Sequence, residues 1–361
     1  MNILESNPID WWRTDIGNDE REELLLAFDQ KRFTMSSSVQ KVEALVASIL
    51  NVPYVVLTNS GSSSLLMSLL ALDITKDDEV IVPSLTWIAT AQAPAMLGAK
   101  VIPCDVLESE PIINTDIIES LITPKTRAII PVHYNGRYAN IDKLKIIANK
   151  YDLSIIEDSC KGLFSRKDGL YFGTLGDVGC FSLGMISPVS VGFGGIVVTK
   201  DKLIYEKLLL VRDHGVNRLP EEYSTMGYNF KISDLLASLA IPQFINHALK
   251  IKKLIKLHDY YEHHLNSKWI SILNVDKVAG SVPVYVEGYS ENREDIISYL
   301  YSNNIETSKF HLPVNKASYL NPAGNPFFNS NRFSNNAFIL PSGPSQSYQD
   351  IDRVLELLNR Y

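Results

Sequence analysis

Small hydroxyl and glycine residues form a first candidate site at residues 58–64. Their order is Thr-Asn-Ser-Gly-Ser-Ser-Ser, between a short apolar run and a longer segment with helical spacing. Free main-chain N–H groups and the dipole at the start of a helix favour a phosphate group. An ordinary helix cap is the structural alternative. Ser60, Gly61 and Ser62 are therefore candidate phosphate ligands.

An aromatic residue and a carboxylate follow two later apolar runs. Trp87 stands where the run at residues 80–82 gives way to a helical segment, and Asp158 follows the run at residues 153–156. Ligands of open α/β sheets bind at the carboxyl ends of strands, so Trp87 could stack on a flat ring or pack in the core. Asp158 needs a cation or several donors if its strand is buried. A protonated ring nitrogen would serve, and helix capping is the alternative.

Glycines are dense between residues 179 and 195. Two apolar runs there flank the sequence Leu-Gly-Met-Ile-Ser-Pro-Val-Ser-Val-Gly-Phe-Gly-Gly, which covers residues 183–195. Such density suggests close approach of the backbone to a neighbour or ligand, although an ordinary hairpin has the same signature.

The overall composition limits the classes of partner and site. The 361 residues are 45% hydrophobic, and 34 basic residues against 41 acidic ones give a formal charge of −7. This balance argues against nucleic acid as a partner. The scattered cysteines Cys104, Cys160 and Cys180 predict neither a disulfide framework nor a metal site. Without a basic and apolar leader or a run near ~18 apolar residues, we expect a cytoplasmic protein and no membrane span.

Seven short apolar runs predict the strands that would position these residues. They cover residues 54–57, 80–82, 101–104, 128–132, 154–157, 179–183 and 195–199. Helical segments at 62–72, 87–97, 116–122 and 141–151 separate the first five runs. Alternation of this kind predicts an α/β fold with a mainly parallel sheet and helices on both faces.

The pattern changes beyond residue 200 and predicts a second unit. Helical segments at 202–211, 233–248 and 250–265 come first, with Pro242 as a kink or a start in one of them. A strand at 282–286, a helix at 293–303, a Pro/Asn/Gly-rich loop at 315–331 and a helix at 348–360 follow. We expect a large domain over residues 1–245 and a small α+β domain over residues 246–361.

Taken together and in order, these segments resemble the DegT/DnrJ/EryC1/StrS family of pyridoxal phosphate (PLP)-dependent sugar aminotransferases. The resemblance extends to residues 131–136, 213–215, 227–234, 305–307 and 340–343. It implies a fold-type I architecture with a three-layer α/β/α large domain, a mainly parallel seven-stranded sheet, and a homodimer. The implied reaction moves an amine from an amino acid such as glutamate to a nucleotide-linked keto sugar, in amino or deoxy sugar synthesis for polysaccharides or glycosylated metabolites.

The resemblance also implies roles for single residues. The phosphate of PLP or of pyridoxamine phosphate (PMP) would be held by Ser60, Gly61, Ser62 and Ser182. Trp87 would stack on the pyridine ring, and Asp158 would keep the ring nitrogen protonated, so that the ring can accept electrons from a carbanion. Asn229 would reach the phosphate of the neighbouring subunit.

Two departures from the family pattern bear on catalysis. Ser187 stands where the family has the lysine that forms a Schiff base with the cofactor, and a serine hydroxyl cannot do so. Lys161 stands where Gln or His is usual, so it could be a relocated lysine, or it could bind the cofactor's phenolic oxygen or point to solvent. Phe193 and Ser308 also differ from the residues common in the family.

Four interpretations follow from these departures. The first is a sugar aminotransferase whose lysine was replaced by serine, by engineering, to trap a complex. The second is a PMP-dependent sugar dehydratase that lacks the lysine, with Lys161, His133 and His214 as candidate acid/base groups. The third gives the lysine's role to Lys161. The fourth is a non-catalytic relative that binds a nucleotide sugar or a partner subunit.

Overall fold

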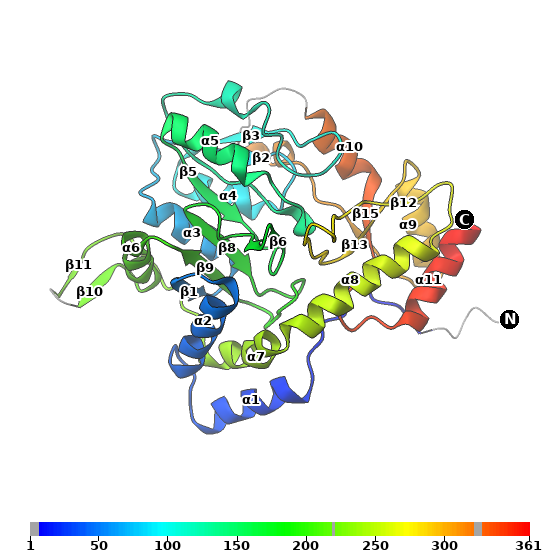
Figure 1. Ribbon diagram of the computed structural model, residues 1–361, viewed down its shortest axis with the longest axis horizontal. Helices are drawn as coiled ribbons and strands as arrows, with labels where there is room; N and C mark the ends of the chain where they lie inside the picture. Colours follow the sequence, from blue (N-terminus) through cyan, green and yellow to red (C-terminus); the bar gives the residue numbers. More distant parts are fainter. Residues whose placement is uncertain (1–6, 219–220, 321–326) are drawn as a thin grey trace.

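A seven-stranded sheet forms the centre of the molecule (Figure 1). The computed structural model describes residues 7–218, 221–320 and 327–361. The strand order is β1-β9-β8-β5-β4-β2-β3, and only β9 runs antiparallel to its neighbours in this sheet. The strands are β1 (Tyr54–Thr58), β2 (Glu79–Pro83), β3 (Lys100–Cys104), β4 (Thr126–Ile129), β5 (Ser154–Asp158), β8 (Val178–Ser182) and β9 (Gly195–Thr199). The α/β fold with a mainly parallel sheet is confirmed, and all seven predicted strands are present.

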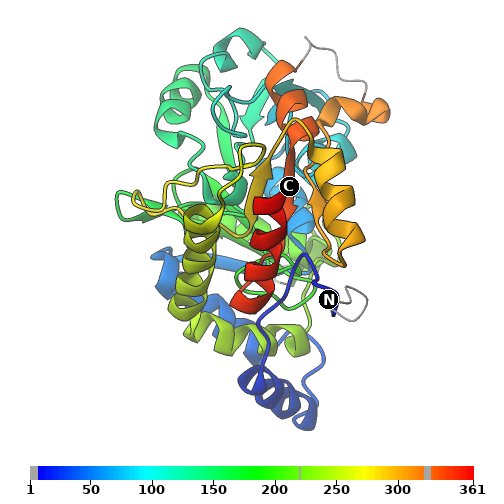
Figure 2. The same cartoon turned by 90° about the vertical axis from the view of Figure 1, so that its right-hand side faces the viewer.

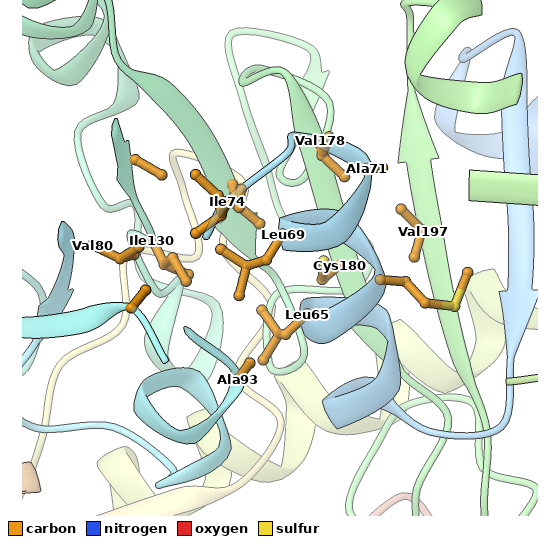
Figure 3. Packing of buried hydrophobic residues seen from close by; sticks show 14 of the residues in the cluster. Leu65, Leu69, Ala71, Ile74, Val80, Ala93, Ile130, Val178, Cys180 and Val197 are labelled. Carbon is orange, nitrogen blue, oxygen red and sulfur yellow. The ribbon is translucent and has the colours of Figure 1, made fainter. Parts of the chain in front are cut away.

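Helices cover both faces of this sheet because successive strand residues point to opposite sides. Val197 of β9 packs with α3 (Gly61–Ala71), α4 (Ala89–Met96) and α6 (Lys202–Arg212). In Figure 3, Leu65 and Leu69 of α3 lie between Val80 and Val197 from strands on either side. On the other face, Ile196 and Val198 pack with α2 (Ser37–Leu50) and α7 (Asp234–Ile245), and α5 (Ile141–Tyr151) covers β4 and β5.

A smaller antiparallel sheet lies beside the large one, with the order β12-β13-β15-β14. Its strands are β12 (Ser271–Ile272), β13 (Val286–Tyr289), β14 (Ser308–Lys309) and β15 (Ala337–Leu340). Three helices share its core, namely α8 (His247–His264), α9 (Arg293–Ser302) and α11 (Tyr348–Arg360). The long helix α8 extends from the region below the large sheet to this core (Figure 1). The domain boundary between residues 245 and 246 stays a prediction.

The first described segment forms two isolated bridges to residues that flank strands of the smaller sheet before it enters the larger unit. Ile9 pairs with Ile305, and Trp12 pairs with Ser342. Helix α1 (Asn18–Asp29) then packs against α7 and forms the lower end of the molecule (Figure 2). Neither α1 nor α2 is among the helices predicted from the sequence.

Several predicted elements differ from the structure. The strand expected at 282–286 begins at Val286, because the N–H groups of Val284 and Tyr285 donate to Asn135 Oδ1 and are not paired in a sheet. The helix expected at 116–122 is a 3-10 turn, Ile118–Leu121. Within the loop expected at 315–331, α10 (Phe328–Asn336) begins, and residues 321–326 lie outside the described residues. Pro242 lies inside α7, which ends at Ile245.

Short elements complete the described chain. They are the hairpins β6 (Arg166–Lys167) with β7 (Leu170–Tyr171) and β10 (Val216–Arg218) with β11 (Glu221–Tyr223), and the 3-10 turns Tyr134–Gly136, Val314–Lys316 and Ser318–Leu320. Among the helices of the described residues, none has the length and apolarity needed to cross a membrane.

Replacing Gly179 of β8 tests how closely its neighbours pack. A Cβ atom there would lie 1.9 Å from the carbonyl oxygen of Gly173, and main-chain atoms cannot swing away. We expect Gly179→Ala to lower the free energy of unfolding by about 1–3 kcal/mol or more in urea denaturation. Gly17→Ala, whose Cβ would meet its nearest neighbour at 3.7 Å, should change it by less than about 1 kcal/mol. Equal values for the two variants would contradict the expected clash.

Candidate functional site

The turn between β1 and α3 meets two other strand ends in a narrow space. Ser60 caps α3, and its Oγ accepts a hydrogen bond from the Ser63 N–H at 3.1 Å. A Cβ atom added to Gly61 would lie 2.9 Å from Cys160 Sγ and 3.0 Å from Ser182 Cβ. The turn, the loop after β5 and the end of β8 therefore converge at Gly61. Exposed Ser62 and half-buried Ser182 contribute hydroxyl groups on either side.

Asp158 is a buried carboxylate with polar donors and no cationic partner within the described residues. Its side chain is at the end of β5, and the residue is only 4% exposed. Thr90 Oγ1 donates to Oδ2 at 2.8 Å, and the Cys160 N–H donates to Oδ1 at 3.1 Å. A carboxylate buried in this way gains most from a bound cationic group.

Trp87 faces an open pocket and not the core. Its side chain is 62% exposed, which contradicts the core alternative for this residue. The ring of His311 lies 5.5 Å from that of Trp87 and 5.5 Å from that of Tyr134, both in edge-on contacts. A pocket of about 410 Å³ is lined by Thr86, Trp87, Ile88, Phe310, His311 and neighbouring residues. An aromatic face is thus available beside a concave surface.

His311 is a candidate site residue that the sequence did not single out. Burial lowers the pKa of its ring to about 4, and the nearby Lys161 ammonium adds to this effect. The imidazole is therefore uncharged at neutral pH. The residues around position 311 form no recognisable sequence motif, and only the folded chain brings His311 beside Trp87.

Lys161 reaches the chain segment in which the family has its lysine. Its Nζ donates a hydrogen bond to the main-chain carbonyl of Ile186, the residue before Ser187. Burial lowers the pKa of this amine to about 8, although Cys160 and Asp158 act in the opposite direction. The side chain is therefore held inside the protein and is not directed to solvent.

Ser187 has no free hydroxyl for chemistry. The residue is 1% exposed, and its Oγ donates to the carbonyl oxygen of Ser182 at 2.7 Å. Its role in the structure is to close the turn that follows β8. The amine of Lys161, one departure from the family pattern, thus contacts the residue directly before Ser187, the other departure.

His133 is held in the core by contacts to both of its ring nitrogens. Its Nε2 lies 2.7 Å from Glu157 Oε2, and its Nδ1 accepts the Ala139 N–H at 3.3 Å. The ring is fully buried and stacks on Phe172 at 4.4 Å. Both ring nitrogens thus have hydrogen-bond partners within the protein, and a catalytic role for His133 stays a prediction.

His214 and Asn229 lie on the exposed side of the molecule. His214 adopts a left-handed conformation with a φ of 60°, and its N–H donates to the carbonyl of Tyr228. Asn59 Nδ2 donates to the main-chain oxygen of Asn229 at 3.3 Å, so Asn229 lies next to the candidate phosphate loop of its own subunit. Contact of its side chain with a neighbouring subunit stays a prediction.

The arrangement fits a phosphorylated pyridine cofactor. A helix start with serine hydroxyls suits a phosphate, and Gly61 leaves the cradle that a Cβ would fill. The buried Asp158 suits a protonated ring nitrogen, and Trp87 offers an exposed aromatic face. At the position of the expected lysine, however, the structure offers the Ser187 hydroxyl and, from another loop, the Lys161 amine.

Comparison with known proteins identifies the family. The model of the DegT/DnrJ/EryC1/StrS aminotransferase family matches residues 14–359. The chain belongs to this family. The family comprises sugar aminotransferases and dehydratases, so the resemblance seen in the sequence is confirmed. The family and its structural neighbours imply PLP or PMP as the cofactor.

Individual DegT/DnrJ/EryC1/StrS proteins are similar over most of their length. A GDP-perosamine synthase from Escherichia coli O157:H7 is 29% identical over 331 residues, which cover 90% of each chain. The structure of S. venezuelae DesV, solved with a ketimine intermediate, has a TM-score of 0.91 and 25% identity over 98% of each chain. GDP-4-keto-6-deoxymannose-3-dehydratase (ColD) with bound GDP-perosamine shares the fold, with a TM-score of 0.88 and 22% identity over 97% of this chain and 100% of that one.

Glu157 supports the site from the opposite side of β5, and its loss should destabilise the fold. The carboxylate accepts main-chain N–H groups from Gly173, Leu175 and Gly176 in addition to its contact with His133. We expect Glu157→Gln to lower the free energy of unfolding by about 2–4 kcal/mol at pH 7, measured in urea. The exposed control Glu119→Gln should change it by less than about 1 kcal/mol.

The same variant should show a defined dependence on pH. Burial opposes ionisation of Glu157, but the hydrogen bond from His133 and the main-chain N–H groups hold its pKa below the usual 4.5. A carboxyl with a lowered pKa in the folded state stabilises the protein above its unfolded pKa and loses this effect as the pH falls. The difference between wild type and Glu157→Gln should therefore shrink below pH 4.5. A constant difference would contradict the assigned charge state.

Proposed function

We propose that this protein is a vitamin B6-dependent enzyme that transfers an amine from an amino acid such as glutamate to a nucleotide-linked keto sugar. The observation that carries this proposal is the buried Asp158 carboxylate, which has polar donors but forms no ion pair with a described residue and lies beside a helix start suited to phosphate. The similarity of this chain to a GDP-perosamine synthase, over 90% of both chains, supports a GDP-linked or related sugar as the substrate.

The chain's own residues would divide the work as follows. Ser60, Gly61, Ser62 and Ser182 would hold the phosphate. Trp87 would cover one face of the ring, and Asp158 would keep the ring nitrogen protonated. When bound, PLP or PMP supplies an electron-accepting ring that stabilises a carbanion at the substrate carbon. Buried Asp158 would orient that ring, and the pocket beside Trp87 and His311 would admit the sugar.

A homodimer would complete the site. Asn229 is exposed beside Asn59 and the candidate phosphate loop. A groove of about 610 Å³ runs between α3, α4 and the segment that carries Asn229, and Met96, Met226 and Tyr228 expose more than two thirds of their surface on it. An apolar surface of this kind suits a subunit interface. We propose that Asn229 binds the phosphate of the partner across it.

A PMP-dependent sugar dehydratase is the second candidate. Residue 187 carries a hydroxyl, which is hydrogen-bonded to the Ser182 carbonyl and, unlike an amine, cannot form a Schiff base with a cofactor. A dehydratase that holds PMP noncovalently would not need one. A non-catalytic relative that binds a nucleotide sugar is the third possibility, and it predicts that neither cofactor form binds.

Replacing Asp158 tests the cofactor site directly. We expect Asp158→Asn to weaken PMP binding by about 30-fold to 1,000-fold, because truncating a buried, hydrogen-bonded charge pair costs ~2–4 kcal/mol. Binding is measured by equilibrium dialysis with absorbance of the cofactor. The exposed Asp116→Asn is the control and should bind like wild type. Equal PMP affinity in both variants would show that Asp158 does not contact the ring nitrogen.

Product analysis separates the three functions. Wild type and Ser187→Lys are incubated with PLP, glutamate and GDP-4-keto-6-deoxymannose, and the products are measured by mass spectrometry. Amine transfer replaces the carbonyl oxygen by an amino group, whereas a dehydratase removes a hydroxyl group. We expect an amino sugar from both proteins, formed faster by Ser187→Lys because it regains the family's lysine. Loss of a hydroxyl group would favour the dehydratase, and failure to bind PLP and PMP would favour the non-catalytic relative.

A further inference from the structure

We propose that Lys161 forms the covalent bond to the cofactor aldehyde that Ser187 cannot form, so that the amine enters the site from the loop after β5 and not from the loop after β8. This inference rests on the proposed vitamin B6 dependence. It assigns a catalytic role to a residue at which the family pattern has a different side chain.

The backbone brings Lys161 to the required place. The residue lies three positions after Asp158, whose carboxylate would bind the cofactor ring nitrogen, and one position after Cys160, whose Sγ lies against Gly61 in the candidate phosphate cradle. From there its side chain spans to the β8–β9 connection and donates to the carbonyl of Ile186. The amine thus lies against the residue that directly precedes Ser187, the position of the family's lysine.

The surroundings of Lys161 are unlike those of a structural lysine. In the described part of the chain, no carboxylate forms an ion pair with its Nζ, which bonds to a neutral carbonyl. The charged and titratable groups around it are Asp158, Cys160 and His311. His311 is uncharged at neutral pH, and burial outweighs the effects of Asp158 and Cys160.

This setting makes the amine reactive at neutral pH. Nucleophilic attack requires the uncharged amine, and burial lowers its pKa to about 8. About one tenth of the side chains would then carry the free base at pH 7, some 300-fold more than for a lysine with the usual pKa. The carbonyl of Ile186 can hold the ammonium form in place without neutralising it.

The chemical step needs no further reactant. The free Lys161 amine attacks the aldehyde carbon of PLP, a carbon–nitrogen double bond replaces the carbon–oxygen double bond, and the oxygen leaves as water with the two amine hydrogens. No atom is oxidised or reduced. Borohydride then reduces the carbon–nitrogen double bond to a stable single bond, which marks the lysine involved.

The test is to find which lysine of the full chain carries the reduced adduct. Wild type is incubated with PLP, reduced with borohydride and digested, and the peptides are analysed by mass spectrometry. We expect the phosphopyridoxyl adduct on Lys161, with half-maximal formation near pH 8. Lys167→Ala, which removes a half-buried lysine on β6 that pairs with Asp142, should keep the adduct. An adduct on another lysine, or bound PLP without any adduct, overturns the proposal but leaves the proposed function intact.

Lys161→Arg separates covalent chemistry from a purely structural role. Arginine keeps the positive charge and a donor for the Ile186 carbonyl, but its guanidinium does not form the adduct. We expect this variant to lose the adduct at least 50-fold while its PMP affinity stays within about threefold of wild type. A matching loss of PMP binding would mean that Lys161 only holds the site together, and the covalent role would be wrong. If wild type binds neither PLP nor PMP, this proposal and the proposed function fail together.

Discussion

The close approach of three strand ends at Gly61 is the constraint on which the site depends. A side chain at this position would collide with Cys160 and Ser182, and a Cβ on Gly195 would lie 2.3 Å from the carbonyl oxygen of Ser60. Strands β1, β5, β8 and β9 can bring their ends together only because these two residues lack side chains. The hydroxyl groups, the buried carboxylate and the Lys161 loop are neighbours as a result.

Two adjacent carboxylates on β5 show how one strand serves both stability and function. Glu157 and Asp158 point to opposite faces because side chains alternate along a strand. Glu157 binds His133 and the main chain of residues 173–176, so it fastens a loop to the sheet. Among the described residues, Asp158 accepts hydrogen bonds from Thr90 and Cys160, so it retains capacity for a ligand. We therefore expect a substitution of Glu157 to affect stability and a substitution of Asp158 to affect ligand binding.

The central sheet could be predicted from the sequence because buried parallel strands appear as short apolar runs between helical segments. The sequence was insufficient where the main chain pairs with side chains, as Asn135 does with Val284 and Tyr285 in place of a strand. The sequence pattern pointed to His133 and not to His311 as a candidate acid/base group. Only tertiary contacts show that the first is sealed against Glu157 and Phe172 and that the second faces Trp87.

The structure of the loop that connects β8 and β9 determines which of its residues can be substituted. Its base is closed by the pairing of Ser182 with Gly195 and by the hydrogen bond from Leu183 N–H to Gly194. A substitution at the exposed tip of a loop whose two ends are paired has little effect on the sheet to which the loop is attached. Exposed Met185 at the tip can therefore be exchanged at low cost to folding, whereas buried Ser187 closes the turn, so a larger side chain at position 187 must replace its hydrogen bond to Ser182.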